Sequence, residues 1–212
     1  VISFLGLTKK CIVVDLDNTL WGGVIGEDGF DGIRLGPQPP GNAFIEFQKY
    51  LKALSQRGIL LAINSKNNFD DAIQVIREHP YMILKEGDFS CMKINWNNKA
   101  SNMLEISEEL NIGLDSAIFL DDSSFEISEV QSVLDIDTIQ ISTNNPVDNL
   151  KIFDHLVSVK TLNITKEDKE KSYQYQAQEK RKKDKKNFKS IGDYLSSIDM
   201  VVNMSINDKN KA

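Results

Sequence analysis

The sequence contains only two cysteines, Cys11 and Cys91, in 212 residues, and neither belongs to a CxxC motif or a Cys/His pair. A disulfide framework or a zinc site is therefore not indicated, and we expect both thiols to be reduced. No apolar run approaches the roughly 20 residues of a membrane-spanning helix. The N-terminal VISFLGLTKK also lacks the charged, apolar and small-residue order of a signal peptide. These absences lead us to expect a cytoplasmic protein.

The charged residues are unevenly distributed along the chain. Residues 1–159 carry 12 Lys and Arg against 23 Asp and Glu, whereas residues 160–190 carry 11 against 5. With 41% hydrophobic and 26% charged residues, the composition is that of an ordinary globular protein. We predict an acidic domain over residues 1–159 and a basic, mainly helical C-terminal extension over residues 160–212. We expect neither nucleic acid nor a membrane as a partner.

Strand patterns alternate with helical patterns through the acidic domain. Buried strands are expected over residues 11–17, 59–64, 81–86, 116–122 and 136–141. Helices are expected over residues 42–58 (capped by Asn42 and stopped by Gly58), 65–80, 99–112, 123–134 and 147–157. Residues 21–35 predict a short flap or hairpin with EDG at its turn, and residues 87–96 predict a loop. The result is an α/β fold: a Rossmann-like, mainly parallel sheet with helices on both faces and a minimal cap.

Polar residues accumulate where parallel strands would end, which is where such sheets bind ligands. The clusters are Asp15 with Asp17, Asn64 with Ser65, Lys99 near a helix start, and Asp121 with Asp122. Carboxylates brought together there would repel one another, so a hard divalent cation, Mg²⁺ with several waters, is expected. A metal and a carboxylate beside a phosphate predict phosphoryl chemistry, with a carboxylate nucleophile and a second acid for the leaving oxygen.

Four of these segments resemble the motifs of the haloacid dehalogenase-like superfamily: DLDNT after an apolar strand, ILLAINS, a lysine before a helix, and IFLDD. The resemblance implies that Asp15 is the nucleophile, Asp17 the general acid/base and Lys99 a charge-offsetting group. It implies that Asp121 and Asp122 complete a Mg²⁺ site with the Asp15 carboxylate and the Asp17 main-chain carbonyl. Among substrate-binding residues, Ser65 would bind phosphate and Thr19 would fix the loop; the remaining two would be Asn64 and Lys66.

A narrower resemblance covers nearly the whole chain. DLDNTLWGGVIGEDG, RGILLAINSKNN, INWNNKASNM and LDDSSFE are similar to FkbH-like proteins, and LNITKEDKEKSYQYQAQEKR looks like the segment that follows their catalytic domain. FkbH-like enzymes work in polyketide pathways. The resemblance implies transfer of a three-carbon acyl group, glyceryl or lactyl, from an acyl phosphate such as 1,3-bisphosphoglycerate. The acceptor would be the phosphopantetheine thiol of an acyl carrier protein, and phosphate would be lost.

Residue 64 departs from the family pattern. Many members have a cysteine directly before the motif serine, well placed to hold the acyl group, but this chain has Asn64. Cys91 lies in a predicted loop that could approach the site, whereas Cys11 is expected to be a small core residue. We therefore expect direct transfer to the carrier thiol rather than a thioester at position 64.

Two other functions remain open. The chain could be a stand-alone phosphatase acting on a protein or a small phosphoester, or a non-catalytic carrier-binding module. Trp21 and Trp96 are expected to be packing or flap residues. The basic residues 180–189 are expected to steer an acidic carrier, and the start at Val1 and the end at NDKNKA lead us to expect a piece of a larger synthase.

Overall fold

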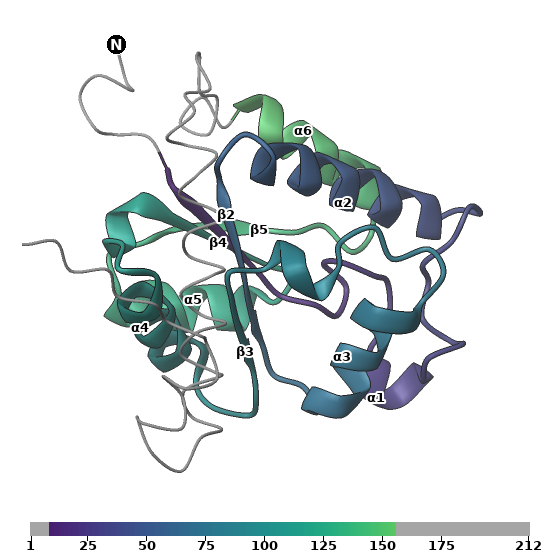
Figure 1. The fold of residues 1–212 in the computed structure, drawn as a ribbon, viewed down its shortest axis with the longest axis horizontal. Helices are drawn as coiled ribbons and strands as arrows, with labels where there is room; N and C mark the ends of the chain where they lie inside the picture. The colour runs from purple at the N-terminus through teal and green to yellow at the C-terminus, as the bar shows by residue number, and fades with distance from the viewer. Residues whose placement is uncertain (1–8, 156–212) are drawn as a thin grey trace, which may run out of the picture. The chain divides into compact units, whose positions relative to one another are not determined.

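A computed structural model describes residues 9–155 (Figure 1). The predicted extension over residues 160–212, with its basic segment 180–189, lies outside the described residues. Five strands form one sheet: β1 (Cys11–Val14), β2 (Leu60–Ser65), β3 (Cys91–Ile94), β4 (Ala117–Asp121) and β5 (Asp137–Gln140). The helices are α1 (Ile25–Asp28), α2 (Gly41–Ser55), α3 (Phe69–Glu78), α4 (Lys99–Leu110), α5 (Ser124–Val133) and α6 (Asn149–His155).

The sheet has the order β3-β2-β1-β4-β5, and every neighbouring pair is parallel. Because β1 is central, the residues that follow it lie between the ends of β2 and β4. All carboxyl ends meet at one edge, which we call the carboxyl edge. This arrangement confirms the predicted Rossmann-like architecture and fixes where the polar clusters must gather.

Alternate residues of the central strands face opposite layers. Ile12 and Val14 pack in one core with residues of α2 and α3, whereas Val13 packs in a second core with residues of α4 and α5. Figure 1 shows α2 and α6 together on one side of the sheet and α4 with α5 on the other. Burial on both faces explains why CIVV is a continuous apolar run rather than an alternating one. Among residues 9–155, no helix combines the length and apolarity needed to cross a membrane.

The strand expected over residues 81–86 is wrong, and so is the loop expected over residues 87–96, which contains β3. Met82 and Leu84 are buried, and this alternation imitates a strand. However, the backbone N–H groups of Ile83 and Leu84 donate to Oε1 of Gln48, at 2.8 and 3.2 Å. A side chain of α2 therefore satisfies amides that a neighbouring strand would otherwise bind.

The flap over residues 21–35 closes as predicted at its ends but differs inside. Gly22 and Arg34 exchange two backbone hydrogen bonds, of 3.1 and 2.7 Å, as an antiparallel bridge. Between them the chain forms the single turn α1, so EDG begins within a helix and Gly29 ends it with φ of 70°. The expected cap of the next helix is also wrong. Asn42 lies inside α2, because Pro40 has a helix-compatible conformation and its carbonyl already accepts from Ala43.

Candidate active site

Three carboxylates meet at the carboxyl edge. Asp15 directly follows β1, Asp121 ends β4, and Asp122 comes next; one oxygen of each lies within 4.8 Å of the others. The Asp15 backbone N–H donates to the carbonyl of Leu120 over 2.9 Å, which extends the β1–β4 pairing beyond the strand and sets Asp15 beside Asp121. Asp15 and Asp121 are buried, so little water shields their mutual repulsion.

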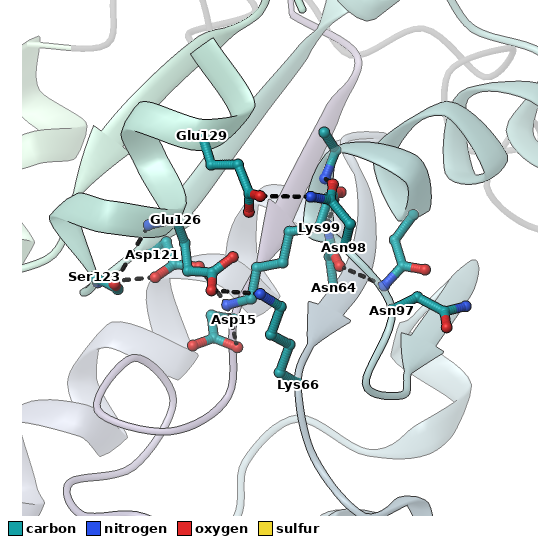
Figure 2. A network of polar contacts seen from close by, with 12 residues as sticks. Asp15, Asn64, Lys66, Asn97, Asn98, Lys99, Asp121, Ser123, Glu126 and Glu129 are labelled. Atoms are coloured by element: carbon teal, nitrogen blue, oxygen red, sulfur yellow. Dashed lines mark hydrogen bonds and ion pairs between the residues drawn. The ribbon is translucent and has the colours of Figure 1, made fainter. Parts of the chain in front are cut away.

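Lys99 supplies a cation to this cluster. Its Nζ lies 2.5 Å from Asp121 Oδ2 and 3.2 Å from Asp15 Oδ1, as Figure 2 shows. Lys99 is the first residue of α4, and the Asn98 side chain caps that helix by accepting from the backbone N–H groups of Ala100 and Ser101. The cap therefore fixes where the buried ammonium enters the site.

The charges in the cluster are not balanced by the protein alone. Burial, followed by repulsion from Asp15, raises the pKa of Asp121, and the same two causes raise the pKa of Asp122 to about 6. Burial alone would lower the pKa of Lys99, but the carboxylates of Asp15 and Asp121 outweigh it and raise the pKa. Mutual repulsion between these buried carboxylates favours the binding of a cation among them.

A divalent cation fits the three carboxylates. They offer hard oxygen donors from two neighbouring strands, and the single charge of Lys99 does not offset all three. Asp15, Asp121 and Asp122 would therefore hold the Mg²⁺ expected from the sequence.

Asp17 has a different setting. One oxygen of its carboxylate accepts from Trp21 Nε1 at 2.8 Å and from the Ile25 backbone N–H at 3.0 Å, and the other accepts from Asn67 Nδ2 at 3.0 Å. Burial is the main cause of its raised pKa, which these three donors partly offset. The flap and the segment after β2 thus hold the Asp17 carboxylate in place, and its role as a general acid/base stays a prediction.

Ser65 and Thr19 are buried at the same edge. Ser65 ends β2, and its Oγ accepts from Asn67 Nδ2 at 3.2 Å. Thr19 Oγ1 has no hydrogen-bond partner among the described residues, although it is buried. Ser65 was predicted to bind phosphate and Thr19 to fix the loop, and their substrate-binding roles stay predictions.

Asn64 and Lys66 point to different neighbours. Asn64 is fully buried; its Nδ2 donates to the Lys99 carbonyl at 2.9 Å, and its Oδ1 accepts from Asn102 Nδ2 at 3.0 Å. The nitrogen and the oxygen of its side-chain amide therefore both bind residues in the first turn of α4. Lys66 instead forms an ion pair with Glu126 of α5, with Nζ 2.6 Å from Oε1.

Several partners of the site residues were not predicted from the sequence: Asn67, Asn98, Asn102, Glu126 and Glu129. Asn98 Nδ2 donates to Glu129 Oε1 at 2.6 Å, which joins α4 to α5 (Figure 2). The asparagine-rich strings SKNN and NWNNK, which lie just after two strands, were a signal for capping and loop-fixing amides. Nothing in the sequence pairs the glutamates of α5 with residues 30 to 60 positions away.

The two tryptophans differ in burial, and neither cysteine belongs to the carboxylate cluster. Trp21 is fully buried in the flap, whereas Trp96 is 69% exposed and is therefore not a packing residue. Cys11 is the first residue of β1, at the edge opposite the cluster, whereas Cys91, the first residue of β3, is in register with Ala62 and so lies level with Val13 of β1. Cys91 Sγ donates to Glu109 of α4 at 3.0 Å.

Comparison with known proteins agrees with this geometry. No family model and no curated protein matches the chain. The N-terminal part of BF1531 from Bacteroides fragilis, a solved structure that contains a phosphatase domain complexed with Mg, is 40% identical, with a TM-score of 0.72. The chain therefore shares the parallel α/β fold of this phosphatase domain. The match covers 76% of this chain but 43% of the Bacteroides fragilis chain, so our sequence spans less than half of that relative.

A second solved structure is less similar to this chain. A HAD family enzyme from Bacteroides thetaiotaomicron, in complex with magnesium and inorganic phosphate, is 18% identical, with a TM-score of 0.46. That match covers 67% of this chain and 98% of the other.

Proposed function

We propose that this chain is a Mg²⁺-dependent enzyme that removes phosphate from a small phosphorylated substrate, with Asp15 as the nucleophile. The observation that carries the proposal is the cluster of Asp15, Asp121 and Asp122 around the Lys99 ammonium, at the end of the central strand. The Mg-bound phosphatase domain, at 40% identity, supports the same chemistry.

The residues divide the reaction between them. An Asp15 carboxylate oxygen attacks phosphorus while the bond from phosphorus to the leaving oxygen breaks, and Asp17 donates a proton to that oxygen. Asp17 then accepts a proton from the water that hydrolyses the aspartyl phosphate. Lys99 and the Ser65 hydroxyl bind the phosphoryl oxygens. The bound Mg²⁺, held by Asp15, Asp121, Asp122 and the Asp17 carbonyl, would neutralise charge on the phosphoryl group.

A finer proposal follows from the FkbH-like sequence. We propose that the substrate is a three-carbon acyl phosphate and that the acyl acceptor is the thiol of an acyl carrier protein in polyketide biosynthesis. The thiolate attacks the acyl carbon, the bond between that carbon and the phosphate oxygen breaks, and phosphate leaves. Cys11 lies four residues before Asp15 on an extended strand, roughly 13 Å away, and the Cys91 thiol is hydrogen-bonded to Glu109 of α4. These positions favour a thiol from the carrier.

Phosphate release tests the first proposal. The wild-type chain should release phosphate from small phosphoesters with Mg²⁺ and lose this activity with a chelator. Asp15→Asn should lower kcat by at least about a thousandfold, because the nucleophile is lost. Asp137→Asn is the matched control, since Asp137 begins β5 at the opposite edge and pairs with Lys9. Asp15→Asn with wild-type turnover would contradict the proposal.

The mass of the carrier tests the finer proposal. After incubation with 1,3-bisphosphoglycerate, intact-protein mass spectrometry should find a 3-phosphoglyceryl group on a phosphopantetheinylated carrier, or a glyceryl group once the C3 phosphate has been hydrolysed; a lactyl phosphate is the matching donor for a lactyl group. The double variant Cys11→Ala, Cys91→Ala should still transfer it. A rate of phosphate release that is the same with and without the carrier, with no mass added to the carrier, would favour the stand-alone phosphatase. The phosphatase domain of the relative also supports that alternative.

A further inference from the structure

The ion pair of Lys66 and Glu126 crosses the candidate active site. Lys66 directly follows the last residue of β2, and Glu126 lies in the first turn of α5, just after the β4 carboxylates. Because β2 and β4 flank β1 in the sheet, a pair between these two segments spans the end of β1, where Asp15 lies. In Figure 2 the two side chains point toward each other, and their charged atoms are 2.6 Å apart.

This pair has unused hydrogen-bonding capacity. A lysine ammonium has three N–H donors, and Glu126 Oε1 is the one recorded acceptor for Lys66 among residues 9–155. The other carboxylate oxygen, Oε2, is buried without a partner there, and the Lys66 side chain is 29% exposed. A purely structural pair elsewhere is more complete: Lys52 Nζ contacts both oxygens of Asp88, at 2.7 and 2.6 Å.

The charges nearby give this ammonium a use. Lys99 is engaged by Asp15 and Asp121, and the proposed function assigns it and the metal to the phosphoryl group, so a second anionic group on a substrate needs another cation. Lys66 carries a positive charge on the β2 side of that cluster. A lysine kept in place by one carboxylate, with donors to spare, is suited to bind a further anion through charge-assisted hydrogen bonds.

We propose that Lys66 forms a second anion-binding position, separate from the phosphoryl position at Asp15, and that Glu126 holds its ammonium there. The preferred substrates are then phosphorylated acids, compounds that carry a carboxylate or a second phosphate besides the transferred phosphoryl group. This inference rests on the proposed phosphate-releasing function and names its substrate class. Glu126 is a positioning residue, because it acts through Lys66.

A matched pair of substrates tests the proposal. 3-Phosphoglycerate has a terminal carboxylate where glycerol 3-phosphate has a neutral CH₂OH group, and the two compounds are otherwise alike. The wild-type chain should prefer 3-phosphoglycerate by about tenfold or more in kcat/KM, the effect of one hydrogen bond to a charged group. In Lys66→Met this preference should fall close to one, mainly because the KM for 3-phosphoglycerate rises.

Three variants separate binding from structural effects. Glu126→Gln still accepts a hydrogen bond from Lys66 and should keep most of the preference, whereas Glu126→Leu should lose a large part of it. Lys49→Met removes the same charge from an exposed pair with Glu46 on α2. It should leave kcat/KM unchanged for both substrates. A wild-type chain without the preference, or a Lys66→Met variant that keeps it, would overturn the proposal.

The substrate-class inference and the phosphatase function can fail separately. If the wild-type chain releases phosphate from neither compound, the phosphatase function fails, but calorimetric binding constants with Mg²⁺ still report the same preference. Loss of that preference in Lys66→Met would then support the anion-binding position on its own. Turnover of both compounds at equal kcat/KM would leave the phosphatase function standing and remove Lys66 from substrate selection.

Discussion

The loops after β1 and β4 each bring two acids to the carboxyl edge, but they surround them differently. In the β1 loop, Asp17 accepts three hydrogen bonds, from Trp21, Ile25 and Asn67. In the β4 loop, burial and the neighbouring Asp15 raise the pKa of Asp122 to about 6, and the Lys99 charge and a hydrogen bond from the Asn18 side chain offset this only in part.

This difference separates two uses of a buried carboxylate. Asp17 is held by protein donors, so its position does not depend on a bound cation. Asp122 and its neighbours repel one another when no cation is bound. The stability of the folded protein should therefore depend on Mg²⁺. The contrast predicts opposite responses when each loop is changed.

The largest expected effect is in the β4 loop. Asp122→Asn should raise the melting temperature in the presence of a chelator, because it removes one repelling charge. It should also remove the stabilisation by Mg²⁺, which is about 2.7 kcal/mol for a ligand at 100 times its Kd. Thermal unfolding with and without Mg²⁺ measures both, with Asp137→Asn as the control. A variant that Mg²⁺ stabilises as much as wild type would place the cation elsewhere.

The next effect is in the β1 loop. Trp21→Phe keeps an aromatic ring but removes the N–H that donates to Asp17, so kcat should fall about tenfold or more, with a smaller change in KM. Trp96→Phe is the same substitution at an exposed tryptophan and should leave kcat unchanged. Steady-state kinetics of the two variants decides the matter. Equal kcat values would mean that the flap does not position Asp17.

The smallest expected effect is on the pH dependence of the free energy of unfolding, and it concerns His79. His79 packs against Phe30 of the flap, with ring centroids 5.3 Å apart. Burial and then Lys85 lower its pKa, whereas Asp31 opposes this shift. The fold therefore favours neutral His79, while the unfolded chain takes up a proton below pH ~6.5, so stability should fall as pH drops through this window.

His79→Asn should reduce that pH dependence. Asparagine does not titrate, and its side-chain oxygen can accept as Nδ1 of His79 does from the Tyr81 backbone N–H. Melting temperatures between pH 7.5 and about 5 give the measurement. The same slope in both proteins would show that other groups control acid sensitivity.

Much of the fold was predictable from the sequence. β1, β2 and β4 are apolar or β-branched runs, β5 lies in the alternating segment IDTIQI, and acids at the ends of parallel strands must meet at one edge. Residues 81–86 were misassigned because Gln48 replaces a strand as the acceptor of backbone amides. The meeting of Lys66 with Glu126 was out of reach, because two charged side chains 60 residues apart carry no local pattern.

Gln48 also gives the molecule a mechanical connection. Its Nε2 donates to the Leu20 carbonyl at 2.7 Å, while its Oε1 binds the amides of Ile83 and Leu84. Leu20 directly precedes Trp21, the residue that donates to Asp17. One buried side-chain amide thus ties the segment before β3 to the backbone that carries Trp21 and, through its N–H, the Asp17 carboxylate. Gln48 joins two parts of the chain that share no strand pairing.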